Sequence, residues 1–212
     1  MFCNQVVSRA RDKSAPLLIG MLLDPSAAAI VRVAERIGGL TRKPLPKILG
    51  PALYPALAQT TASGNHGRRR RMAVRFGLGA GGLGLVLLLP LVVFGETILG
   101  LAFGPGFAAA YVPMLLFALA GVIRMFISPL GPLLNVTGHV FSTFGVQLIA
   151  TGVWATTMWL LVDAVEVSAV PLAQIAQVLV TAGMMYALAR RYLPDQAKRP
   201  PKGPERNPAA DA

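Results

Sequence analysis

Residues 68–100 read RRRRMAVRFGLGAGGLGLVLLLPLVVFGETILG, and this stretch decides the fold. Four arginines open it, and residues 76–95 carry no charge. As a helix that rises about 1.5 Å per residue, a run of this length spans the roughly 30 Å hydrocarbon core of a bilayer. Because lysine and arginine in short loops stay on the cytoplasmic side, the stretch predicts a transmembrane helix with Arg71 inside and Glu96 outside.

Composition extends this interpretation to the whole chain. Of its 212 residues, 54% are hydrophobic and only 14% are charged, and the mean hydropathy is +0.59. Soluble domains carry about 25% charged residues, so the composition indicates a membrane protein. The net charge of +11 is interpreted as a set of topology signals beside apolar spans, and we expect no binding to nucleic acid.

The residue sets that catalytic and metal sites need are missing from the sequence. Cys3 is the single cysteine, and His66 and His139 fall in predicted loops without ligand-spaced partners. We therefore expect no internal disulfide, no metal site and no cofactor. No carboxylate pair, Ser/His/Asp set or Cys/His set occurs, so nothing supports hydrolysis or group transfer, and we expect a protein that is not an enzyme.

Six segments, several of them interrupted by proline or charge, predict an all-α, polytopic bundle of about six transmembrane helices. Their bounds lie near residues 7–23, 27–58, 73–95, 107–135, 140–161 and 169–189. This assignment puts the basic groups on one side and Asp24, Glu96, Asp163 and Glu166, without any lysine or arginine, on the other. We therefore expect a membrane domain over residues 1–193 with both termini cytoplasmic. The proline-rich, charged residues 194–212 predict a disordered cytoplasmic tail.

Arginines inside the predicted spans are the candidate binding residues, because a charge in the hydrocarbon is costly and usually faces a water-filled cavity or a partner. Arg124 has no acidic residue in its own span, and we expect it to line a cavity. For Arg32 and Arg36 two readings stay open. They line the same cavity, or Glu35 neutralises one of them and the side chains reach towards the membrane surface. The planar guanidinium fork suits a phosphate or pyrophosphate ligand.

Small and polar residues within the spans predict contacts between helices. Gly77, Gly79 and Gly82 match the dinucleotide-binding pattern, but that pattern needs a preceding strand, and here a tetra-arginine loop precedes it. The spacing of Gly77, Ala80, Gly81 and Gly84 instead predicts close helix–helix packing. The amides inside spans, namely Asn135, Gln147, Gln174 and Gln177, predict interhelical hydrogen bonds.

Several segments, taken in order, resemble the C-terminal half of polysaccharide flippases of the O-antigen type. RARDKSAPLLIGMLLDPSAAAIVRVAERIGGL at residues 9–40 looks like the family's seventh helix and the start of its eighth. PALYPALAQ at 51–59 is similar to the end of the eighth helix, and FGETILGLAFGPGFAAAYVPMLLFALAG at 94–121 to the ninth-to-tenth junction. PLGPLLNVTGH at 129–139 looks like the end of the tenth helix. The resemblance covers about residues 5–192.

The resemblance implies a transporter of the multidrug/oligosaccharidyl-lipid/polysaccharide exporter superfamily, with two six-helix bundles around a central cavity. Such a protein moves an undecaprenyl-pyrophosphate-linked glycan across the inner membrane by alternating access, for polysaccharide or lipopolysaccharide synthesis. Cavity arginines of such relatives engage the pyrophosphate, and Arg32, Arg36 and Arg124 are the candidates here. A full transporter has about twice as many helices. We therefore expect this chain to need an N-terminal half, a partner chain or a second copy, besides membrane lipids.

Two other functions stay open. A drug- or cation-efflux transporter of the same superfamily is one, although a cationic lining would repel cations. A non-transporting membrane fragment or scaffold from a truncated or split gene is the other, and the polar first segment together with the missing half favours it.

Overall fold

The computed structural model describes residues 25–41, 66–136 and 140–196, and in these ranges the chain is all helical. The α-helices are α2 (Pro25–Gly38), α4 (His66–Phe103), α5 (Tyr111–Ile127), α6 (Leu130–Val136), α7 (Val140–Val165) and α8 (Ala169–Gln196). Short 3₁₀ helices join them: η1 (Gly39–Thr41), η2 (Pro105–Ala110) and η3 (Glu166–Ser168). The predicted first span, the second half of the predicted span 27–58 and residues 197–212 of the predicted tail lie outside the described residues.

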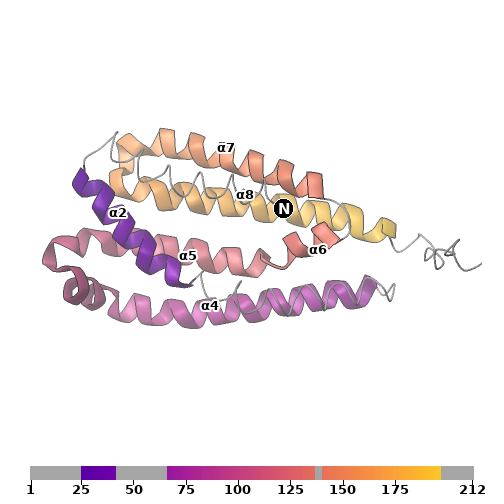
Figure 1. Cartoon of the computed structure of the whole chain (residues 1–212), viewed down its shortest axis with the longest axis horizontal. Helices are drawn as coiled ribbons and strands as arrows, with labels where there is room; N and C mark the ends of the chain where they lie inside the picture. The colour runs from indigo at the N-terminus through magenta and orange to yellow at the C-terminus, as the bar shows by residue number, and fades with distance from the viewer. Residues whose placement is uncertain (1–24, 42–65, 137–139, 197–212) are drawn as a thin grey trace, which may run out of the picture.

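The long helices lie side by side as a bundle with α5 at its centre (Figure 1). α4 packs on one side of α5 and α8 on another, and α7 packs along α8. The shorter α2 crosses α5 near the end of the bundle that holds η2 and η3. The start of α4, α6 and the end of α8 lie at the opposite end (Figure 1). We call these the η2/η3 end and the His66 end.

The surface of the bundle is that of a membrane protein. Three stretches are long and apolar enough to cross a bilayer, namely Met72–Phe103, Pro105–Asn135 and Phe141–Arg191, the last of which contains both α7 and α8. Large apolar side chains are exposed along them, such as Leu101, Phe141 and Trp159. In water these side chains would lose the hydrophobic stabilisation that burial provides, whereas lipid solvates them. A bundle of six spanning helices remains a prediction.

Close packing of α4 on α5 confirms the interpretation of the glycine spacing. A methyl group on Gly77 would lie 2.6 Å from the carbonyl oxygen of Phe126, and one on Gly84 would lie 2.7 Å from the sulfur of Met125. The ring of Phe126 fills the space beside Gly81 in the same way. Gly79 and Gly82, in contrast, have no such neighbour within 4 Å among the described residues. Gly77, Gly81 and Gly84 therefore serve helix packing, as their spacing predicted.

Two predicted spans differ in detail from the structure. α4 continues past the predicted end near residue 95 to Phe103, and Leu99 in this extension is buried in the core. The apolar stretch Pro105–Asn135 agrees with the predicted span 107–135, but the helix in it is interrupted between Ile127 and Leu130. Pro129 has no N–H to donate to the carbonyl oxygen of Met125. The backbone N–H and the hydroxyl group of Ser128 donate to that oxygen instead, at 3.3 and 2.9 Å.

One smaller expectation also differs from the structure. α8 passes through Pro194 to Gln196, so the helix overlaps the predicted tail by three residues.

The two tryptophans of α7 have different surroundings. Trp154 is buried in the core against other helices, whereas Trp159 is exposed. The difference follows from their position on α7: five residues separate them, which places their side chains on different faces of the helix.

The core is concentrated at the η2/η3 end. Its main cluster takes Val31, Ala34 and Ile37 from α2, Leu91 and Leu99 from α4, Met114 and Phe117 from α5, Trp154 and Met158 from α7, and Val170 and Ala173 from α8. Towards the His66 end the buried apolar clusters are small, one around Ala73 and Leu133 and one around Ala80 and Met125. The helices are therefore tied together most firmly where α2 crosses them.

Candidate functional site

The contacts between α4 and α5 provide a scale for depth in the membrane. Gly95 packs on Tyr111 and Met114, Gly84 packs on Met125, and Gly77 packs on Phe126. The two helices therefore run antiparallel with a fixed register. If the charge-free residues 76–95 of α4 cross the hydrocarbon, Gly95 marks one boundary, Gly77 marks the other, and Gly84 lies close to the centre.

Arg124 lies close to the middle of this scale. It neighbours Met125, which packs on Gly84. Its side chain is half-buried and has at least one interaction partner within the bundle. The sequence predicted a deep arginine here, and the register of α4 against α5 gives the same depth. A guanidinium at this level needs polar surroundings, because a charge at the bilayer centre costs roughly 2.5–3.5 kcal/mol even on the lowest scales.

The face of α5 that carries Arg124 is the one that α2 covers closer to the η2/η3 end. Phe117 contacts Gly38 at the end of α2, and Arg124 follows Phe117 by seven residues, or two helical turns. Arg124 therefore lies on the same face of α5 beyond the point where α2 and η1 end.

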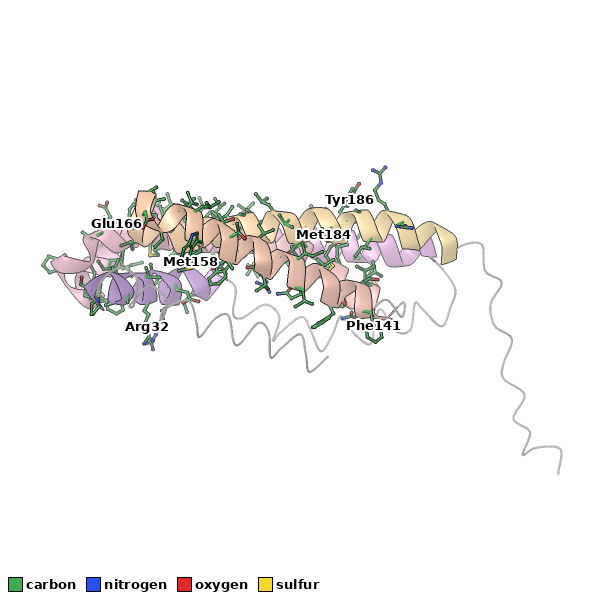
Figure 2. The ribbon with its side chains drawn as sticks, turned by 90° about the horizontal axis from the view of Figure 1, so that it is seen from above. Arg32, Phe141, Met158, Glu166, Met184 and Tyr186 are labelled. Atoms are coloured by element: carbon green, nitrogen blue, oxygen red, sulfur yellow. The ribbon has the colours of Figure 1, made fainter. Side chains whose placement is uncertain are left out.

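Arg32 and Arg36 occupy the opposite face of α2 from the one that packs. The packing face consists of Val31, Ala34, Ile37 and Gly38, all buried, whereas both arginines are exposed. Figure 2 shows Arg32 pointing away from the bundle, on the same side as Phe141. This arrangement follows from the sequence, because positions four residues apart share a helix face and the two arginines are spaced that way.

The α2 arginines also lie at a different depth from Arg124. Gly38 packs on Met114 and Phe117, which are level with the part of α4 just inside Gly95. Arg36 and Arg32 precede Gly38 towards the η2/η3 end, so they lie near the boundary of the charge-free run. The structure therefore does not bring the three predicted cations together. Side chains at this level reach the headgroup region more easily than Arg124 does.

Polar side chains within the bundle fulfil part of the hydrogen-bonding prediction. The hydroxyl group of Thr143 in α7 donates to Oδ1 of Asn135 in α6, at 2.9 Å, which is an interhelical bond of the predicted kind. Gln177 in α8 is 2% exposed, and its Oε1 accepts no hydrogen bond within the described part of the chain. A buried amide oxygen without a donor is costly, and the sequence did not predict it. In the described ranges no group of three His, Cys, Asp or Glu residues is placed to hold a metal.

Comparison with known proteins finds a membrane protein that is similar to part of this chain. The chain is similar to the inner membrane protein YghQ of Escherichia coli (strain K12), with 28% identity over 102 residues. The matched residues are 48% of this chain and 28% of the relative, so the chain spans less than a third of that protein's length. No family model matches the chain, and no solved structure matches it. The apolar helices give this chain the character of a membrane protein, and the relative is an inner membrane protein.

Proposed function

We propose that this chain is the C-terminal half of an inner-membrane flippase for lipid-linked oligosaccharides. In this proposal it works with an N-terminal half, a partner chain or a second copy, and moves an undecaprenyl-pyrophosphate-linked glycan by alternating access. Both termini are cytoplasmic. The observation that carries the proposal is the half-buried Arg124 at the depth of Gly84. A cation is retained at such a depth where it serves a ligand or ion path.

The chemistry of Arg124 suits the pyrophosphate of the substrate. A guanidinium offers two parallel donors to a phosphate oxygen pair, and these charge-assisted hydrogen bonds are stronger than neutral ones. The substrate must carry its doubly charged linkage across the hydrocarbon core, where water cannot solvate it. Arg124 would offset that cost halfway along the path. In this proposal Arg32 and Arg36, nearer the boundary, meet the same group as it enters or leaves.

The test is transport of the lipid-linked glycan in native membranes. Its measure is the rate at which the glycan of the undecaprenyl-pyrophosphate carrier becomes accessible on the periplasmic side. We expect Arg124→Gln to lower this rate about tenfold or more, as the loss of one charge-assisted hydrogen bond predicts. Arg124→Lys should be intermediate, because it keeps the charge and loses the fork. The paired variant Arg32→Gln with Arg36→Gln should lower the rate less.

Arg191→Gln provides the matched control, because Arg191 is exposed at the far end of α8 and loses the same charge. All variants are compared at equal protein level in the membrane. Unchanged transport in Arg124→Gln, or equal losses in Arg124→Gln and Arg191→Gln, would reject the role of Arg124. Efflux of a cationic dye that depends on this chain would instead favour the drug-efflux branch.

A further inference from the structure

A groove opens between α4 and α8 at the His66 end of the bundle. Its volume is about 410 Å³. α4 contributes Ala73, Val74, Gly77 and Leu78, the α5–α6 region contributes Phe126, Leu130 and Leu133, and α8 contributes Tyr186, Ala189 and Arg190. We call it the α4–α8 groove. It lies beside the break near Pro129, after which α6 tilts away from the line of α5 (Figure 1).

The groove lies where both walls change from apolar to basic. On α4 the charge-free run begins at Phe76, directly after the exposed Arg75, and the first turns of the helix hold Arg68–Arg71. On α8 the apolar run ends at Ala189, and Arg190 and Arg191 follow. A change of this kind on two neighbouring spans marks the boundary between hydrocarbon and headgroups. The apolar floor of the groove therefore lies at the level of the hydrocarbon, and its basic rim lies at the level of the lipid headgroups.

Arg190 is held at the rim of the groove. Its guanidinium carbon lies 5.6 Å from the centre of the Tyr186 ring, which is a cation–π arrangement. The ring limits the positions that the guanidinium adopts, and the N–H donors of a guanidinium suit an anion. None of the described residues that line the groove is acidic. Figure 2 shows Tyr186 on the opposite side of the bundle from Arg32, so the groove is separate from the arginines of α2.

We propose that the α4–α8 groove binds an anionic glycerophospholipid, with the lipid phosphate on Arg190 and the start of an acyl chain on the floor. Two observations favour this occupant over a protein partner. The charge of the rim is complementary to an anionic headgroup, and the depth places an apolar floor beside hydrocarbon and a basic rim beside phosphates. Basic pockets between spanning helices on the cytoplasmic side bind such headgroups. The groove volume lies within the range of about 300–1,000 Å³ that is typical of small-molecule sites.

The experiment is native mass spectrometry of the purified full chain in detergent, with added phosphatidylglycerol or phosphatidylcholine of identical acyl chains. We expect the chain to retain phosphatidylglycerol in preference to phosphatidylcholine. Arg190→Gln should weaken phosphatidylglycerol retention about fivefold, as the loss of one basic residue beside an anionic lipid predicts. Arg191→Gln removes the same charge one residue away, outside the groove lining, and should change retention little.

A second variant tests the apolar floor. Val74→Trp places a large side chain in the groove from an exposed position, and it should lower retention of both lipids without loss of the folded protein. Equal retention of the two lipids by the unaltered chain would overturn the proposal. The same holds if Arg191→Gln weakens retention as much as Arg190→Gln, or if undecaprenyl pyrophosphate displaces phosphatidylglycerol completely. This readout does not involve glycan transport, so it stands or falls separately from the flippase proposal.

Discussion

Gly38 of α2 lies directly against the backbone of α5 at Met114. A methyl group on Gly38 would lie 2.5 Å from the carbonyl oxygen of Met114 and 2.8 Å from Cβ of Phe117. Backbone atoms of a helix cannot move aside as a flexible side chain can. This contact sets the position of α2 on α5, and with it the outward direction of Arg32 and Arg36.

The first prediction follows from this contact. We expect Gly38→Ala to destabilise the detergent-solubilised protein by roughly 1–3 kcal/mol, as overpacking in a tight interior does. The measurement is the melting temperature followed by size-exclusion chromatography. Gly79→Ala is the control, because no atom of another helix lies within 4 Å of that position. Alanine is also the better helix former, so this control should melt at the same or a higher temperature. Equal melting of both variants would show that α2 packs differently.

Gly81 and Phe126 provide a second prediction about packing. The Phe126 ring fills the position that a methyl group on Gly81 would take. We expect Gly81→Ala to destabilise the protein and Phe126→Ala to remove that penalty when both changes are combined. A coupling energy of roughly 0.5–3 kcal/mol is typical of residues in contact. Gly82→Ala, which has open space around it, should show no coupling to Phe126→Ala. Additive effects in the Gly81 pair would contradict the contact.

Sequence reasoning succeeded where one physical preference dominates. The bilayer is the one environment that suits the long, charge-free run at residues 76–95. The membrane-spanning part of α4 could therefore be predicted from the length of this run. Gly77, Gly81 and Gly84 could be assigned to packing because small residues allow close approach of helices in a membrane. Helix ends were harder. Whether α4 stops at Glu96 or continues to Phe103 depends on burial of Leu99, which is a tertiary contact.

In the candidate site, too, some features could be predicted from the sequence and others depend on tertiary contacts. The depth of Arg124 follows from its place within an apolar span, and the register of Gly84 on Met125 agrees with it. The spacing of Arg32 and Arg36 predicted a shared helix face, which the structure confirms. Their distance from Arg124 could not be predicted, because it depends on where Gly38 meets α5. The α4–α8 groove was missed because it depends on how three separate parts of the chain pack together, namely α4, the α5–α6 region and α8.

The hydrogen bond between Thr143 and Asn135 gives the third prediction. It joins α7 to α6, and Thr143 is buried. We expect Thr143→Val, which keeps the shape of the side chain, to destabilise the protein by about 0.6–1.7 kcal/mol, the range for interhelical hydrogen bonds in membranes. Thr156→Val is the control, because the Thr156 hydroxyl group bonds to Gly152 in its own helix, at 3.0 Å. A larger loss of melting temperature in the control would contradict this assignment.

The orientation of the bundle gives the last prediction. Asp163 and Arg191 are both exposed and lie at opposite ends of the α7–α8 pair. α8 has 28 residues, or about 42 Å at 1.5 Å per residue, which is enough to separate its ends by a bilayer. In a Cys3→Ser background, we expect a membrane-impermeant maleimide to label Asp163→Cys in intact cells and Arg191→Cys only after lysis. The reason is that basic residues stay cytoplasmic. Labelling of both sites in lysed cells controls for reactivity. The reverse pattern in intact cells would invert the bundle, and labelling of both sites would mean that α8 does not cross the membrane.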